Sequence, residues 1–209
     1  MADFTAIREL FHITEPCGFD DESLTPWMER YGHIPQVLRT YYTELGAHAA
    51  LNATQDFLVL PHKFPRYMEE DYCIFYTENQ EACVWGIRAA DMKLDNPPVY
   101  VRSGAEWERL RSSVKEFLLA MAHMQAVLAM EYSSEEYWEI DEAAAERIEQ
   151  SFPSRQADSD LYTGVRFFGR PGELIVIMNN NGGHLLLFAA EDEERLDELY
   201  NLFGEWTEQ

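Results

Sequence analysis

The sequence is short of basic residues, of cysteine and of long apolar runs. Among its 209 residues only 16 are lysine or arginine, against 38 aspartates and glutamates, so the formal net charge is −22. Proteins that bind nucleic acid or anionic membranes do so through clustered lysine and arginine. The charge balance therefore argues against both kinds of partner and favours a cationic one. Solubility alone is the other interpretation of so acidic a surface.

Cysteine is scarce, and its positions suggest no metal site. Cys17, Cys73 and Cys83 fit no metal-ligand spacing, and three thiols cannot all pair within one chain. A reducing compartment is the simpler interpretation. The first ten residues contain acids and no apolar run, unlike a signal peptide. The most apolar stretch, residues 117–130, is about four residues shorter than the ~18 that cross a bilayer. We therefore expect a cytoplasmic protein without a membrane span.

Motifs of catalysis and cofactor binding are missing from the sequence. It contains no nucleophile elbow, P-loop, dinucleotide fingerprint or paired zinc ligands. The acidic run Asp20-Asp21-Glu22 lacks the alternating oxygen ligands and the turn glycine of a calcium loop. His123 lies in a buried-looking helix and is interpreted as a polar group satisfied by a backbone carbonyl, with a buried general base as the alternative. We predict a protein that is not an enzyme and that binds no metal or cofactor.

The residues that are present suit a folded protein. Hydrophobic residues make up 46% and aromatic residues 13% of the chain. A chain of this length buries a core without disulfides or metals. Short strands and helices in mixed order predict an α+β fold with a mostly antiparallel sheet packed by helices.

The expected elements follow from hydrophobic periodicity and from turn residues. In chain order we expect helices at 6–11 and 35–45, strands at 56–60, 72–77, 83–87 and 98–102, a helix at 113–128, an acidic helix at 137–148, a three-stranded meander at 162–168, 173–178 and 184–189, and a final helix at 191–203.

Two of these elements are expected to lie at the centre of the fold. Ser113 and Glu116 form a capping-box pattern before a helix that is apolar nearly all round, and such a helix is buried. Residues 174–178 are apolar without alternation, which is typical of a central strand covered on both faces. Pro171-Gly172 and Asn181-Gly182 are the expected turns of the meander.

The excess charge of the second half lies on two short segments. Residues 131–150 contain 8 acids and 1 base, and residues 191–209 again contain 8 and 1, so these two segments carry −14 of the −22. Residues 151–190 balance, with 3 acids and 3 bases. Helix capping explains residues 191–194, which radiate around a helix axis instead of converging on a metal. We expect the two segments to steer a cationic partner, with contacts from Glu135, Glu136, Glu139, Glu193, Glu194 and Asp197.

A polar turn between two expected strands is a further candidate for partner contact. Glu78, Asn79 and Gln80 project from a hairpin, and Trp85 follows five residues later. The functional interpretation is a polar recognition tip beside an aromatic anchor, because hot spots are often built that way. The structural interpretation is ordinary turn chemistry and a core tryptophan, and both stay open.

The order and spacing of several short segments resemble the SUKH superfamily, which includes fungal cell-wall-assembly regulators and many bacterial immunity proteins. These segments are Ile34-Pro35 and the apolar helix to Leu45-Gly46, Asp71 to Phe75, Glu78-Asn79-Gln80, Val84-Trp85-Gly86-Ile87, Asp91, Asp95, Pro97-Pro98-Val99-Tyr100, Trp107, and Val114 to Leu118. The best-matching part is 34–130, and 131–209 adds the acidic helix, the meander and the C-terminal helix to a single SUKH-like domain over 1–209.

The resemblance implies a protein without catalytic residues. Bacterial members often bind and neutralise a toxin delivered between competing cells, and many such toxins are basic nucleases, which an acidic inhibitor suits. We therefore predict an immunity protein that neutralises a cationic toxin. The alternative is a regulatory scaffold or small-ligand module of the same fold, as the fungal relatives suggest. A deep pocket with two or more converging titratable groups would instead indicate an enzyme.

Overall fold

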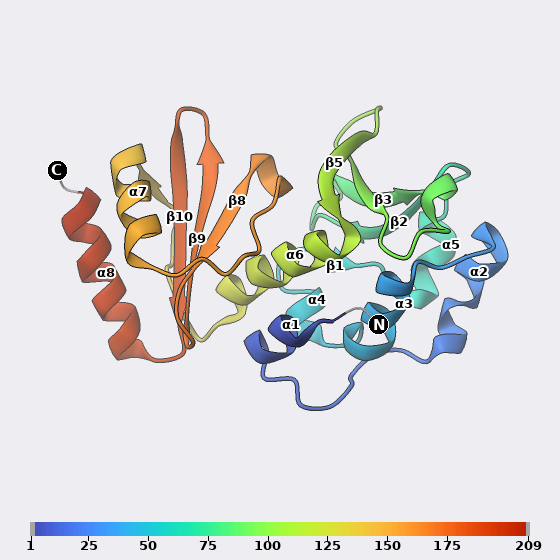
Figure 1. The fold of residues 1–209 in the computed structure, drawn as a ribbon, viewed down its shortest axis with the longest axis horizontal. Coiled ribbons are helices and arrows are strands. Elements are labelled where there is room, and N and C mark those ends of the chain that lie inside the picture. The colour runs from blue at the N-terminus through green and yellow to red at the C-terminus, as the bar shows by residue number, and fades with distance from the viewer. Residues whose placement is uncertain (1–2, 208–209) are drawn as a thin grey trace. The chain divides into compact units, whose positions relative to one another are not determined.

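The fold is α+β, as the sequence predicts, and every strand pair in it is antiparallel. The structure, a computed structural model, describes residues 3–207, apart from the side chain of Thr163. Contacts along the chain divide it into two compact units, Met1–Gln125 and Ala126–Gln209, which we call the N-terminal and C-terminal units. Each unit contains one sheet with helices packed on it (Figure 1). That the two units together form a single domain over 1–209 stays a prediction.

The N-terminal unit is built on a five-stranded sheet in the order β1-β2-β3-β4-β5. Its elements are α1 (Thr5–Leu10), η1 (Asp21–Leu24), α2 (Thr25–Tyr31), α3 (Gln36–Leu45), α4 (Ala49–Asn52), β1 (Phe57–Leu58), η2 (Pro61–Lys63), α5 (Phe64–Tyr67), β2 (Tyr72–Thr77), β3 (Val84–Arg88), η3 (Ala89–Asp91), β4 (Pro98–Arg102), β5 (Glu108–Ser113) and the first three turns of α6 (Val114–Ala129).

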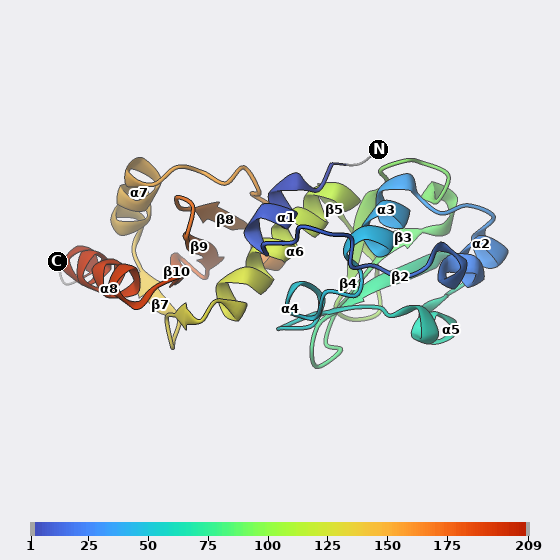
Figure 2. The same ribbon diagram turned by 90° about the horizontal axis from the view of Figure 1, so that it is seen from below.

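Helices α3 and α6 lie along one face of this sheet (Figures 1 and 2). The ring of Phe117 on α6 packs edge-on against Phe75 of β2, with centroids 5.4 Å apart. Tyr42 of α3 is fully buried, and its hydroxyl donates to the carbonyl of Val59 at 2.7 Å. The predicted capping box is confirmed, because Glu116 accepts hydrogen bonds from the Ser113 amide and hydroxyl at 2.7 Å each. Burial of these rings supplies the main stabilisation of this unit.

The C-terminal unit is built on a second sheet in which β6 and β7 both pair with β10, followed by β9 and β8. Its elements, after the end of α6, are β6 (Tyr132–Ser133), β7 (Trp138–Ile140), α7 (Glu142–Ser151), η4 (Leu161–Thr163), β8 (Val165–Phe168), β9 (Glu173–Asn180), β10 (Gly183–Ala190) and α8 (Glu193–Thr207). The predicted meander is therefore confirmed as β8-β9-β10.

Helices α7 and α8 pack side by side on one face of the second sheet (Figure 1). Ile148 of α7 and Phe203 of α8 share a buried cluster with Ile177 of β9 and Phe188 of β10. Strand β9 lies between β8 and β10, and its residues 174–178 are buried on both faces, as expected from their uninterrupted apolar run. The turns predicted at 171–172 and 181–182 connect these strands, and Gly172 and Gly182 both have positive φ.

Two expectations about the elements are wrong. The acidic helix expected at 137–148 begins only at Glu142, because Trp138–Ile140 pairs with β10 as a strand and Asp141 caps the helix by accepting from the Ala144 amide at 2.8 Å. The strand Glu108–Ser113 was not expected, since it contains no β-branched residue and no apolar alternation. Its pairing with β4, which is a tertiary interaction, makes it a strand.

Within residues 3–207, no helix combines the length and apolar character that a bilayer crossing needs.

Candidate functional site

The two acidic segments of the sequence meet in the C-terminal unit. Strands β6 and β7 of the first segment pair with β10, and β10 leads directly into α8 of the second. The Tyr200 hydroxyl on α8 accepts a hydrogen bond from the Glu135 amide at 3.3 Å, and the rings of Tyr200 and Trp138 lie 5.5 Å apart. The balanced residues 151–190 form the strands beneath, so the fold brings together charges that the sequence separates by about forty residues.

All six acidic residues predicted to contact a partner are exposed on this unit. We call them the acidic surface: Glu135, Glu136, Glu139, Glu193, Glu194 and Asp197. The C-terminal unit as a whole contains 19 acidic residues and 5 basic ones in the sequence, which gives a net charge of −14. Because acids outnumber bases in this unit, its electrostatic potential is negative and attracts a cationic partner on approach.

Two acids of helix α8 lie on the side of the helix that faces β6 and β7. Residues three or four apart on a helix lie on one face, so Glu193, Asp197 and Tyr200 form one stripe. Since Tyr200 contacts Glu135 and Trp138, this stripe runs beside Glu135. Glu139 alternates with Trp138 on β7 and therefore points to the face of the sheet opposite α8.

An exposed aromatic residue stands among these acids and was missed by the sequence reasoning. Tyr137 is 48% exposed, the largest value among the exposed large hydrophobic residues. It lies between Glu136 and Trp138, and the half-buried Trp138 packs edge-on against Phe188 at 5.4 Å. Tyrosine and tryptophan are enriched in interface hot spots. The pair Tyr137-Trp138 within an acidic run was the available signal, and it was interpreted as helix spacing instead.

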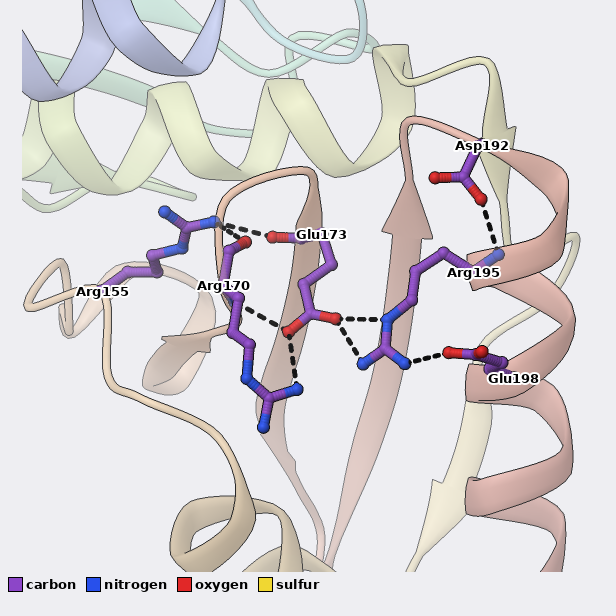
Figure 3. A network of polar contacts seen from close by, with 6 residues as sticks. All are labelled: Arg155, Arg170, Glu173, Asp192, Arg195 and Glu198. Atoms are coloured by element: carbon purple, nitrogen blue, oxygen red, sulfur yellow. Dashed lines mark hydrogen bonds and ion pairs between the residues drawn. The ribbon is translucent and has the colours of Figure 1, made fainter.

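A buried carboxylate anchors the first turn of α8 to the sheet (Figure 3). Glu173, at the start of β9, is 2% exposed and accepts from Nε of Arg195 at 2.6 Å and from the Arg170 amide at 2.8 Å. Arg195 also contacts Glu198, and its own amide donates to Asp192 at 2.8 Å. A buried, multiply hydrogen-bonded ion pair holds a fixed geometry. The acidic residues of α8 are therefore displayed from a rigid turn.

Arg155 completes this network from the loop that precedes β8 (Figure 3). Its Nη2 donates to the carbonyls of Arg170 and Glu173 at 2.5 and 2.8 Å. Burial lowers the pKa of the Arg155 guanidinium, although Glu173 and Glu191 oppose the shift. The turn between β8 and β9, which contains Arg170 and Glu173, is thus bonded to Arg155 in the preceding loop and to Arg195 on α8.

The predicted tip of the N-terminal unit is a hydrogen-bonded turn. The Glu78 carboxylate accepts from the amides of Gln80 and Ala82 at 2.8 and 3.0 Å, so this side chain supports the turn. Asn79 and Gln80 are exposed. The role of the tip in partner contact stays a prediction, carried by Asn79 and Gln80 more than by Glu78.

Trp85 does not accompany the tip at the surface, and its expected role as a contact residue is wrong. It is 2% exposed, and its ring packs against Tyr76 and Phe117 with centroids 6.3 and 5.5 Å apart. A register shift between β2 and β3 places Trp85 opposite Tyr76. The core alternative, which the sequence left open, is the correct one.

A buried carboxyl group lies beneath the tip. Asp56 is 1% exposed, its Oδ1 accepts from the Asn79 amide at 3.3 Å, and its Oδ2 has no hydrogen-bond partner among the described residues. Burial raises the pKa of Asp56 to about 6, against the Asn79 hydrogen bond and with the help of the Glu78 charge. Local sequence patterns do not reveal this burial, because it depends on β1 pairing with β2.

Other polar groups of the chain serve the structure. The imidazole Nδ1 of His123 lies 2.8 Å from the Leu119 carbonyl, which confirms the predicted backbone partner. The turn 179–183 lines an open hollow of about 540 Å³ with Glu142 and His184, whose Oε2 and Nε2 atoms are 2.8 Å apart. In residues 3–207 no three His, Cys, Asp or Glu side chains are grouped to hold a metal ion.

Comparison of the chain with family models, with curated proteins and with solved structures found no match.

Proposed function

We propose that the protein is a non-catalytic binder of a cationic protein and that the acidic surface is its binding site. One observation carries the proposal: two acidic segments, distant in sequence, come together on one unit, where Glu135 contacts Tyr200 of α8, and the exposed Tyr137 belongs to the first of them. Acids spread for solubility alone would not need to converge on one unit, on a helix that the Glu173–Arg195 pair anchors.

The two kinds of residue in this surface have different tasks in the proposal. Exposed carboxylates act at long range, so they raise the association rate and make it depend on salt. Tyr137 supplies apolar contact area at close range, with a hydroxyl that hydrogen-bonds at the rim of an interface. The Glu173–Arg195 anchor limits the conformational entropy that α8 would lose on binding.

The finer proposal is that the cationic partner is a toxin and that binding neutralises it. It rests on the resemblance of 34–130 to the SUKH superfamily and on the charge of the C-terminal unit, which were found independently. An acidic surface that covers the basic substrate-binding region of a nuclease would block it by occupying the phosphate sites.

The experiment is affinity capture from the native host with two variants of equal charge. The surface variant carries E135Q, E136Q, E139Q, E193Q, E194Q and D197N. The control variant carries E9Q, E15Q, E22Q, E29Q, E70Q and D20N, which are exposed positions of the N-terminal unit. We expect a basic protein to be captured by wild type and by the control variant and to be lost from the surface variant. Equal capture by both variants, or no basic protein at all, would contradict the proposal.

A further inference from the structure

The second face of the N-terminal sheet is unlike the rest of this acidic protein. Helices α3 and α6 cover one face, and the opposite face carries six aromatic or arginine side chains that are exposed or half-buried. We call these residues the arginine face: Tyr72, Arg88, Tyr100, Arg102, Trp107 and Arg109. Tyrosine, tryptophan and arginine are the three residue types most enriched in interface hot spots.

The strand register places these side chains together. Tyr72 of β2 is opposite Arg88 of β3, and Tyr100 of β4 is opposite both Gly86 of β3 and Arg109 of β5. Side chains two residues apart on a strand point to the same face, so Arg88 lies on the same face as Gly86 and Tyr100.

The centre of the face is a preorganised stack. The Trp107 indole stacks on Tyr72 with centroids 4.2 Å apart, and the Arg102 guanidinium lies 4.8 Å from the Trp107 ring. Gly86 makes room for the indole, since a Cβ there would be 3.0 Å from it. Arg102 is also held by Glu69 at 2.9 Å. Rings and a guanidinium already fixed in place lose little entropy when a partner packs on them.

Two arginines at the rim of this stack are left uncompensated. Arg88 and Arg109 are both exposed, and within residues 3–207 neither forms an ion pair. Burial, followed by Asp91, raises the pKa of Tyr100, and the charges of Arg109 and Arg88 partly oppose that shift. The Tyr100 hydroxyl donates to Asp91 at 3.2 Å, so one carboxylate lies on this face near Arg109, which is opposite Tyr100. Because acidic residues outnumber basic ones by 38 to 16 in this chain, two arginines without an ion pair on one face are unexpected.

We propose that the arginine face docks an acidic segment of a partner protein, separately from the cationic partner of the acidic surface. Charge complementarity identifies the occupant: Arg88 and Arg109 are suited to bind carboxylates by paired hydrogen bonds, while Tyr100 and Trp107 offer ring surface. Nucleic acid is the less suitable occupant, because its binding rests on roughly 6–10 phosphate contacts and a net charge of −22 opposes it. The protein then joins two partners of opposite charge.

The test uses full-length protein and variants matched in charge. R88Q/R109Q removes both uncompensated arginines, and R30Q/K63Q removes the same charge from exposed positions on α2 and η2. Host lysate treated with nuclease is passed over each protein, and any captured protein lost with R88Q/R109Q is purified and titrated directly. We expect an acidic protein whose affinity falls at least about tenfold with R88Q/R109Q and is unchanged with R30Q/K63Q. R88K/R109K is expected to recover only part of the affinity, because lysine lacks the guanidinium fork.

Several results would overturn the proposal. They are the same set of proteins captured by all variants, a captured protein that is basic, or a captured species that is a second copy of this chain. The surface variant, in which the six residues of the acidic surface are replaced, is also tested in this experiment. Because it leaves the arginine face intact, it is expected to keep the acidic protein while losing the basic one. Failure of the two proposals is therefore distinguishable.

Discussion

Asp56 gives the sharpest prediction for stability. Its carboxyl group is buried, has one long hydrogen bond from Asn79, and has a pKa of about 6 against 3.8 for an unperturbed Asp. The folded state thus prefers the protonated form. The protonated Asp56 makes its full contribution to the unfolding free energy below pH 4, and this contribution is lost as the pH rises from 4 to 6. A shift of this size corresponds to about 3 kcal/mol, which the ionised group costs above pH 7.

The test is Asp56→Asn, which keeps the shape of the side chain and removes the titration. We expect the difference in unfolding free energy, variant minus wild type, to rise by about 3 kcal/mol between pH 4 and pH 7.5, with its midpoint between the two pKa values. Urea unfolding at five or six pH values measures it, and any constant effect of the new amide cancels in the slope. Asp20→Asn, at an exposed position, is the control and should give a flat difference.

A difference that stays constant within about 0.5 kcal/mol over this range would refute the reasoning. A difference that falls with rising pH would do so more strongly, because it would mean that the fold stabilises the ionised carboxylate. Amide shifts of Asn79 locate the effect: they should titrate near pH 6 in wild type and not in Asp56→Asn.

Three further substitutions, one of them with a matched control, test separate parts of the structure by chemical denaturation. Glu173→Gln should lower the unfolding free energy by roughly 3 kcal/mol, because it leaves Arg195 without its buried partner. The side chain of Glu198 is 58% exposed, so Glu198→Gln should cost under about 0.5 kcal/mol. Equal effects of the two substitutions would contradict the anchoring role of Glu173. Asp141→Ala should cost about 1 kcal/mol by removing the cap of α7, and no loss would refute the cap. Gly86→Ala should cost about 1–3 kcal/mol and alter tryptophan fluorescence, since Trp107 must move.

Much of the fold could be predicted from local patterns. Strands β2 and β4 have the bounds expected from their β-branched and aromatic residues, and the capping box before α6 formed as expected. These features depend on neighbouring residues only. Residues 138–140 show the limit, because Tyr137, Ile140, Ala144 and Ile148 have helical spacing, yet pairing with β10 makes Ile140 part of a strand.

The candidate site was predicted in its composition but not in its geometry. Exposure of the six acids follows from their charge. Their convergence does not, because it requires β10 to pair with β6 and β7 and to lead into α8. The short distance of Trp85 from the turn predicts a surface position, whereas its ring packs against Phe117 of α6, a tertiary contact that the local sequence does not reveal. The arginine face likewise arises from the pairing of four strands, one of which has no strand signal.

The measurement that tests the central claim most directly is the association rate constant of the captured basic partner as a function of salt. Stopped-flow mixing with wild type, the surface variant and its matched control separates steering by the acidic surface from the effect of net charge. We predict that the wild-type rate falls at least about tenfold from 20 to 500 mM salt, that the control behaves like wild type, and that the surface variant starts slower and changes little. The same salt dependence in all three proteins would show that the convergence of Glu135, Glu193 and their neighbours has no part in binding.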